Sequence, residues 1–288
     1  MSGRESIDFY EKNWSLIVKL FRVDKTYCVN HGFYEKGIRS HVQSVLKMND
    51  LVGDLLKIDF KNHNIKYVLD AGCGIGGTVI HLAKKYPNIK ITGITNVKNH
   101  IKIAKDNAKQ NNVRKNTTFL LKDFIKTGLP SNKFDAIYLI ESSSYSQKKR
   151  ILLQEMYRLL KPGGIIVFID CFRTNISLNQ YLKNFYNLFC KGWAIPNLVE
   201  LKKFKDYLVL EDFKKITIKD FSKNVERTIL RGDILSLPYI AKILLKKTIY
   251  GKKYKINKDP DLLALAPVFI SFLGLKKAIT YNAIVAKK

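Results

Sequence analysis

The pattern of apolar positions divides the chain into three parts. In segments 5–22 and 38–58, apolar residues recur at steps of three and four, which predicts two amphipathic helices. The loop NHGFYEKG (30–37) between them is dense in aromatic and turn-forming residues. From residue 66 onward, short apolar runs alternate with helical patterns. This alternation indicates a parallel β-sheet whose two faces are both covered by helices.

The middle part of the chain predicts five strands and three helices. The strands are expected at 66–71, 89–94, 117–122, 134–141 and 164–170, and the helices at 77–85, 97–110 and 146–160. The turn LKPGG (160–164) is expected to stop the third helix before the fifth strand. Proline cannot continue a helix, and the glycines permit a reversal of the chain.

The last third of the chain predicts fewer strands. A helix is expected at 176–192, a sixth strand at 214–221 and a seventh at 279–288, with mainly helix and loop between the last two strands. The apolar run 262–275 contains Pro267 and has only 14 residues, so it is too short to cross a bilayer.

Candidate chemistry begins at the glycine loop after the first strand. The sequence LDAGCGIGG (69–77) literally contains the dinucleotide fingerprint G-x-G-x-x-G. However, the second strand ends in Thr95 and Asn96, with no carboxylate for a ribose diol. Asp70 stands beside the loop, where a carboxylate would attract an ammonium group and repel a pyrophosphate. These residues favour S-adenosylmethionine (SAM), which has an amino group and a sulfonium but no phosphate, over NAD.

The end of the third strand supports the same ligand. Asp123 could accept a hydrogen bond from the exocyclic amine of an adenine, and the adjacent Phe124 could pack on the ring. The motifs VLDAGCGIGG, LKDF, FDAIY and LKPGG follow one another in the order and spacing of class I SAM-dependent methyltransferases. The sequence therefore resembles that family over nearly its whole length.

Further motifs are similar to one subgroup, the γ-tocopherol methyltransferase-like enzymes, which are related to sterol C-methyltransferases and cyclopropane synthases. These motifs are NHGFYEKG, G-I-T at the end of the second strand, and KDFSKNV (219–225). The resemblance implies an α/β fold with a Rossmann-like, seven-stranded, mostly parallel sheet and helices on both faces. It also implies a helical segment 1–60 over the cofactor site and a SAM-binding domain 61–288. Helical cap or substrate elements are expected at about 172–212 and 222–277, before the last strand.

The resemblance also implies roles for individual residues at the cofactor. The residues expected to bind SAM, and its product S-adenosylhomocysteine, are Asp70, Gly72, Cys73 and Gly74 at the methionine end, Thr95 and Asn96 at the ribose, Asp123 and Phe124 at the adenine, Glu141, and Tyr34 closing over the site. No metal site is predicted.

The reacting end of the site is expected after the fourth strand, at ESSSY (141–145). Glu141, Tyr145 and His31 are candidate catalytic residues that would orient or deprotonate the acceptor, with Asp170 as a further candidate. The subgroup usually carries a His where this chain has Tyr145, so the acid–base group and the acceptor stay open. Alternatively, ESSSY has only a structural role, as a polar turn that caps a helix. Apolar and aromatic residues expected to line a lipophilic acceptor site are Trp14, Phe33, Trp193, Tyr239 and the run 262–275.

Composition indicates the class of protein and the cellular environment to expect. The chain of 288 residues is 46% hydrophobic, enough for a substantial core. Its four cysteines form no C-x-x-C pair, which argues against a disulfide framework or a zinc site. The N-terminal residues show no apolar signal region, so a cytoplasmic location is expected.

The formal net charge of +27 suggests anionic partners. Nine of the 51 basic residues are Arg and the rest are Lys, the ordinary solvated surface cation, whereas specific nucleic-acid readers rely on Arg. A nucleic-acid methyltransferase stays as an alternative, although the Asn/Asp-Pro-Pro-Tyr/Phe segment of base-amine methylating enzymes is absent. A second alternative is a non-catalytic SAM- or lipid-binding protein. The basic, apolar segment 236–247 favours peripheral contact with a membrane.

Overall fold

The computed structural model describes residues 3–58, 64–251 and 259–288. Within these residues the chain forms a seven-stranded sheet with the order β3-β2-β1-β4-β5-β7-β6. The strands are β1 (Tyr67–Ala71), β2 (Lys90–Thr95), β3 (Thr117–Leu121), β4 (Phe134–Ile140), β5 (Leu160–Arg173), β6 (Lys214–Asp220) and β7 (Ile279–Lys287). Strands β1 to β5 pair in parallel, and β7 runs antiparallel to both β5 and β6. The predicted mostly parallel sheet is confirmed.

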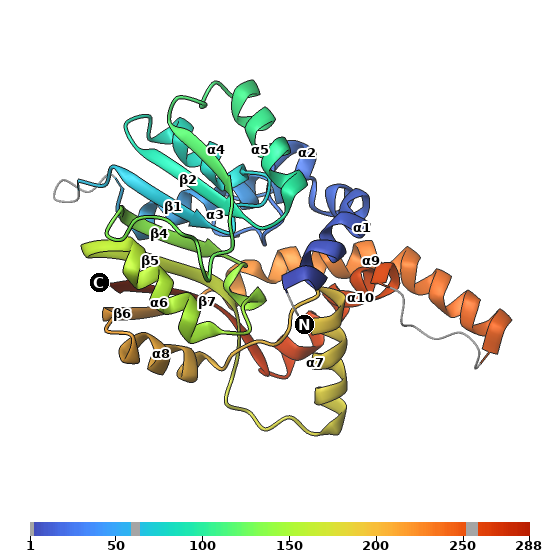
Figure 1. Ribbon diagram of the computed structural model, residues 1–288. Helices are drawn as coiled ribbons and strands as arrows, with labels where there is room; N and C mark the ends of the chain where they lie inside the picture. The colour runs from blue at the N-terminus through green and yellow to red at the C-terminus, as the bar shows by residue number, and fades with distance from the viewer. Residues whose placement is uncertain (1–2, 59–63, 252–258) are drawn as a thin grey trace.

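Helices cover both faces of this sheet, as predicted (Figure 1). Three helices, α3 (His41–Leu56), α4 (Gly77–Lys85) and α5 (Lys98–Gln110), share one core with residues such as Val68. The helices α6 (Lys149–Leu159) and α8 (Leu201–Leu210) share the other core with residues such as Leu69. Because successive side chains of a strand point to opposite faces, neighbouring apolar residues serve different cores. This explains why the strands have continuous apolar sequences.

The N-terminal segment is helical, as its periodicity predicted. It contains α1 (Gly3–Phe21), the short α2 (Val23–Thr26) and α3. Helix α3 begins at His41, three residues later than the predicted segment, because Ser40 and Gln43 form a capping box. In it, the Ser40 hydroxyl accepts from the Gln43 N–H at 3.2 Å, and the Gln43 side chain accepts from the Ser40 N–H at 3.0 Å.

The fifth strand is longer than predicted. Residues 160–164 were expected to form a turn, but β5 begins at Leu160, which pairs with Phe134 before the register shifts. The C-terminal residue supplies the reason, because Lys288 accepts from the Gly163 N–H and donates its own N–H to the Gly164 carbonyl. A partner more than 120 residues away therefore extends the strand through LKPGG.

The elements after β5 divide between the sheet and a separate helical group. Helix α8 lies in the expected cap segment 172–212, but its buried Phe204 packs on Phe168 of the sheet. In contrast, α7 (Gln180–Gly192) and α9 (Ser222–Tyr250) both pack against α10 (Asp259–Leu275), beside the carboxyl edge of the sheet (Figure 1). Helix α7 starts four residues later than predicted because the Asn179 side chain caps it. None of the helices in the described part of the chain has the length and apolar character needed to span a bilayer.

Candidate functional site

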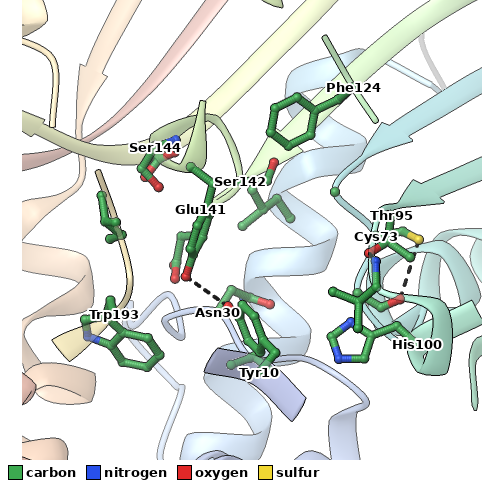
Figure 2. Close-up of a pocket in the computed structure, with 18 of the residues that line it drawn as sticks. Tyr10, Asn30, Cys73, Thr95, His100, Phe124, Glu141, Ser142, Ser144 and Trp193 are labelled. Carbon is green, nitrogen blue, oxygen red and sulfur yellow. Dashed lines mark hydrogen bonds between the residues drawn. The ribbon is translucent and has the colours of Figure 1, made fainter. Parts of the chain in front are cut away.

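A cavity of about 360 Å³ lies at the carboxyl ends of the parallel strands. Small-molecule sites are generally of this size, roughly 300–1,000 Å³, and open α/β sheets bind their ligands at this edge. The sequence-predicted residues that line the cavity are His31, Asp70, Gly72, Cys73, Gly74, Thr95, Asn96, Asp123, Phe124, Glu141, Tyr145 and Asp170, with Trp14 and Trp193. Figure 2 shows part of this lining.

The glycine loop requires glycines for two reasons: its backbone conformation, and neighbouring atoms that leave no room for a side chain. Gly72 has a φ of +127°, and a Cβ there would collide with the Cβ of Ser142. At Gly77, the first residue of α4, a Cβ would collide with the Cys28 thiol and the Tyr27 carbonyl. Gly74 has a φ of +49°, and a Cβ there would meet no atom within 4 Å. The loop is thus packed between the segment that follows β4 and the N-terminal segment, while its tip at Gly74 faces open space.

Asp70 is a buried carboxylate at the end of β1, with 4% of its surface exposed. Burial raises the pKa of Asp70 to about 7. Among the described residues, no basic side chain forms an ion pair with it. A cationic group bound in the cavity would therefore supply the compensating charge that the folded chain does not provide.

The ends of β2 and β3 contribute polar groups to the same cavity. The Thr95 hydroxyl is buried and accepts the Val97 N–H at 3.3 Å, while the neighbouring Asn96 is half-buried at the cavity wall. Asp123 is exposed, and its Oδ1 accepts the Ile125 N–H at 3.0 Å. Phe124 lies beside it, half-buried. Together with Asp70 at the end of β1, these residues present donors and acceptors at the ends of three neighbouring strands.

Glu141, directly after β4, is the centre of a partly buried hydrogen-bond cluster. Its Oε1 accepts from the backbone N–H of His31 at 2.8 Å, from His31 Nδ1 at 2.9 Å and from the Tyr281 hydroxyl at 2.6 Å. Within the described part of the chain, no hydrogen bond reaches its Oε2. Glu141 also has a φ of +47°, an uncommon conformation for a residue with a side chain and one that recurs at functional sites.

The protonation of this cluster follows from its contacts. Burial by itself would raise the pKa of Glu141, but the charge of His31 and the hydrogen bonds lower it below its ordinary value. For His31, burial works toward a lower pKa, but the Glu141 charge and hydrogen bond raise its pKa. An ionised Glu141 only accepts hydrogen bonds, so Nδ1 of His31 carries a proton. In neutral His31, Nε2 is then the proton acceptor.

Tyr145 is held by a residue that the sequence did not single out. Its hydroxyl lies 3.0 Å from the hydroxyl of Tyr10 in α1, and both side chains line the cavity. Burial raises the pKa of Tyr10 to about 12 and raises that of Tyr145. Both hydroxyls are therefore neutral at physiological pH and act as hydrogen-bonding groups.

Behind Tyr145, Asp170 anchors the serine turn. Asp170 Oδ2 accepts from the Ser143 hydroxyl at 2.7 Å and the Ser144 N–H at 2.9 Å. The buried Lys149 donates to the carbonyls of the same two serines at 2.7 and 3.0 Å, and burial lowers the pKa of Lys149 to about 8. The polar residues of ESSSY therefore hold the backbone that carries Glu141 and Tyr145. Sequence reasoning missed Lys149, for which a lysine on the apolar side of a helix was the available signal.

A smaller cavity of about 50 Å³, here called the annex, adjoins the main one. The two share Phe21, His31, Trp193 and Ile270 in their linings. Seven residues on one side of α9 line the annex: Thr228, Ile229, Arg231, Gly232, Leu235, Ser236 and Tyr239. Tyr239 thus lies in the annex, as part of a mainly apolar extension of the site.

Tyr34 and Phe33 are not where the sequence reasoning expected them. The Tyr34 N–H donates to the Asn224 carbonyl at 2.8 Å, and the Arg227 guanidinium lies 4.6 Å from the centre of the Tyr34 ring. Helix α9 therefore holds Tyr34 away from the cavity that it was predicted to close. Phe33 is buried against Phe221 instead of lining the site. From the same N-terminal region, Tyr27 reaches the cavity.

The fold and this cavity define a doubly wound α/β protein with a small-molecule site at its sheet edge. Residues 62–234 match the family model described as methyltransferase domain. The match covers more than half of the chain, so the protein belongs to that family.

Curated relatives share this sequence pattern at moderate identity. Cycloartenol-C-24-methyltransferase of Arabidopsis thaliana is 28% identical over 70% of this chain and 63% of its own length. Norajmaline N-methyltransferase of Rauvolfia serpentina is 27% identical over 68% of this chain and 70% of its own. The chloroplastic tocopherol O-methyltransferase of Arabidopsis thaliana is 25% identical over 68% and 60%. The chain thus spans less than two thirds of two of these relatives. The names of the cycloartenol and tocopherol enzymes agree with the predicted tocopherol- and sterol-related subgroup.

Solved structures share the fold. The [4+2]-cyclase SpnF superposes with a TM-score of 0.74 at 20% identity, covering 98% of this chain and 94% of that one. The geranyl diphosphate C-methyltransferase from Streptomyces coelicolor A3(2), solved with S-adenosyl-L-homocysteine, superposes with a TM-score of 0.73 at 13% identity, covering 98% and 97%. At these identities the likeness concerns the fold alone.

Proposed function

We propose that this protein is a SAM-dependent methyltransferase acting on a small lipophilic acceptor. One observation carries the proposal. In a chain that belongs to the methyltransferase-domain family, the glycine loop, Asp70 and the ends of β2 and β3 all line one cavity. A cytoplasmic enzyme is proposed with it.

The residues of this part of the cavity fit SAM. Asp70 would hold the cofactor's ammonium group, and the glycine loop with Cys73 would lie along its methionine part. Asn96 is better suited to the ribose than Thr95, whose hydroxyl already accepts the Val97 N–H. Asp123 and Phe124 would take the adenine. When bound, SAM supplies an electrophilic methyl group on a sulfonium.

The acceptor would occupy the opposite side of the cavity, among aromatic rings and carboxylates. Tyr10, Trp14, Tyr145 and Trp193 line the cavity together with Glu141 and Asp170. Such surroundings stabilise a cation through ring faces and negative charge. We infer an acceptor whose reacting atom gains positive charge, an amine or an alkene. The carbon- and nitrogen-methylating relatives support this class more than the tocopherol O-methyltransferase does.

Within this site, His31 and Glu141 act as a pair. Glu141 fixes the imidazole through Nδ1, which leaves Nε2 to take a proton that the acceptor releases, while Tyr145 positions the acceptor. Alignment and exclusion of water supply most of the remaining acceleration, since orientation alone contributes on the order of 7–11 kcal/mol in favourable cases.

Calorimetric titration tests the cofactor assignment. The protein should bind SAM and S-adenosylhomocysteine but not NAD. Asp70→Ala should weaken SAM binding at least about 100-fold, since losing one partner of a buried charge pair costs several kcal/mol. The control Asp106→Ala changes an exposed carboxylate on α5 and should leave binding unchanged. Binding of NAD without SAM would contradict the proposal.

A turnover screen tests the reaction. Labelled SAM would be incubated with lipophilic amines, polyprenoid alkenes and phenols, with RNA as a separate arm, and the products read by mass spectrometry. Label in an amine or alkene is expected. Label in RNA would favour the nucleic-acid alternative. SAM binding without any transfer would favour a binding protein or another reaction, because one fold neighbour is a cyclase.

A further inference from the structure

The outer face of α9 carries an exposed apolar stripe. Leu230, Ile234, Leu237, Leu244 and Leu245 are each 50–66% exposed. At 3.6 residues per turn, these five positions fall within a sector of about 100° on one side of the helix. The C-terminal half of α9 extends beyond the rest of the molecule (Figure 1). Single exposed leucines are ordinary, but an aligned row of them marks an interaction surface.

Charge on this part of α9 has a single sign. From Ile234 to Tyr250 the sequence contains three lysines and no Asp or Glu. Lys242 and Lys247 are exposed, and their positions along the helix place them on the two sides of the apolar stripe. A helix with an apolar stripe flanked by lysines is typical of segments that lie on an anionic membrane surface.

The other side of the same helix lines the annex. Thr228, Leu235, Ser236 and Tyr239 face that cavity, which continues into the main site through His31 and Trp193. The apolar stripe and the annex are therefore on opposite sides of one helix. A lipophilic molecule dissolved in a membrane under α9 would lie one helix diameter from the annex.

We propose that the stripe on α9 docks the protein on an anionic lipid bilayer and holds the annex one helix diameter from the membrane surface. A second copy of the chain is a poorer occupant, because a two-fold contact along the stripe would bring the flanking lysines of both copies together. Anionic headgroups neutralise those lysines instead. Delivery of the acceptor through the annex rests on the proposed function, whereas the docking itself does not.

Vesicle co-sedimentation tests the docking surface. The wild-type chain should sediment with vesicles of phosphatidylcholine plus phosphatidylserine, and much less with phosphatidylcholine alone. The triple variant Leu237→Gln/Leu244→Gln/Leu245→Gln should lose at least about tenfold in partitioning, because it removes the main apolar side chains of the stripe. A separate variant, Lys242→Gln/Lys247→Gln, should lose roughly 25-fold on anionic vesicles, about fivefold for each lysine.

Helix α8 provides a matched control. Its Val209 and Leu210 are 55% and 62% exposed, and the same helix carries Lys202, Lys203 and Lys205. The variant Val209→Gln/Leu210→Gln should partition like the wild-type chain. Equal losses in the α8 variant and the α9 triple variant would overturn the proposal in favour of nonspecific apolar contact by several parts of the surface.

Two further results would overturn the proposal. One is a wild-type chain that stays in the supernatant with anionic vesicles. The other is a dimer in light scattering that the α9 triple variant converts to monomers, which would make a second copy the occupant of the stripe. Calorimetry with SAM on the same variants keeps the proposed function separate. Failure of SAM binding in the wild-type chain would refute the cofactor assignment and leave the vesicle result standing.

Discussion

The two sides of the cavity are built in different ways. The proposed cofactor side comes from β1, β2, β3 and the loops that follow them, so its residues lie within about 55 positions of one another and within one layer of the fold. The proposed acceptor side depends on distant pairs. Tyr10 meets Tyr145 across 135 positions, Glu141 meets His31 across 110, and Tyr281 reaches Glu141 across 140.

This difference shows which part of the cavity follows from the fold and which part depends on contacts particular to this chain. Parallel strands of an α/β sheet necessarily bring their carboxyl ends together, so the cofactor side follows once the sheet forms. The acceptor side requires α1, the loop around His31 and the helices α7 and α10 to dock on that edge. Substrate choice can therefore change through the docked segments while the cofactor side stays intact.

The largest expected effect is on the acceptor side. Glu141→Gln replaces the charge that fixes His31 and keeps its pKa high, so turnover should fall by roughly 10²–10⁴-fold, the range of general acid–base contributions. SAM affinity should change by less than about twofold if Glu141 serves the acceptor side. Turnover kinetics together with SAM calorimetry measure both effects.

The control for Glu141 is Glu226→Gln, which neutralises an exposed glutamate on α9 and should change neither quantity. The sequence predicted both a catalytic and a cofactor-binding role for Glu141. A large loss of SAM affinity in Glu141→Gln would favour the cofactor-binding role. The boundary between the two sides would then lie beyond β4.

The next effect concerns the cofactor side and its pH dependence. In the ligand-free protein the pKa of Asp70 is about 7, whereas in the unfolded chain it has its ordinary value near 3.8. The folded state therefore binds the proton more tightly, and stability falls as the pH rises from about 4 to about 7, by up to about 4 kcal/mol. Asp70→Asn should remove this fall and raise the unfolding free energy of the ligand-free protein at about pH 8.

Denaturant titrations of both proteins at about pH 5 and pH 8 measure this effect. The stabilisation should be clearly larger at pH 8 than at pH 5, and SAM should stabilise the wild-type chain but not the variant. A variant that is less stable than the wild-type chain at pH 8 would contradict the burial of an uncompensated charge at Asp70. The buried carboxylate of Asp70 is thus expected to lower the stability of the ligand-free protein while it strengthens SAM binding.

Most of the residues that the sequence assigned to the proposed cofactor side line the cavity, because the signals behind that assignment are local. Short apolar runs and the period-3.6 pattern located most strands and helices to within a few residues, and Asp70 could be placed at the edge of the sheet from its position in one strand. The fold class required no side-chain detail. The prolonged β5 is the exception, since its first residues depend on Lys288.

The acceptor side could be predicted only in part. His31, Glu141 and Tyr145 were named, but their partners Tyr10 and Tyr281 were not, because nothing near those tyrosines in the sequence shows what they will contact. For Tyr34 the sequence predicted a contact with the cavity that the structure does not contain. Tyr34 stands in an aromatic loop as His31 does, yet the docking of α9 at Asn224 and Arg227 turns it to another surface.

The smallest expected effect tests whether α1 forms part of the acceptor side in solution. Tyr145→Phe and Tyr10→Phe each remove one hydroxyl of a partly buried pair, so each should cost about 1 kcal/mol of stability. In the double variant Tyr10→Phe/Tyr145→Phe, the cost should be about 1 kcal/mol less than the sum of the two single changes, because the second change leaves no unpaired hydroxyl behind. Denaturant titration gives these values, and Tyr157→Phe, away from the cavity, is the control that should add independently. Additive costs for Tyr10 and Tyr145 would show that α1 leaves the cavity edge in solution, and the acceptor side would then be formed by β4, α7 and α10 without it.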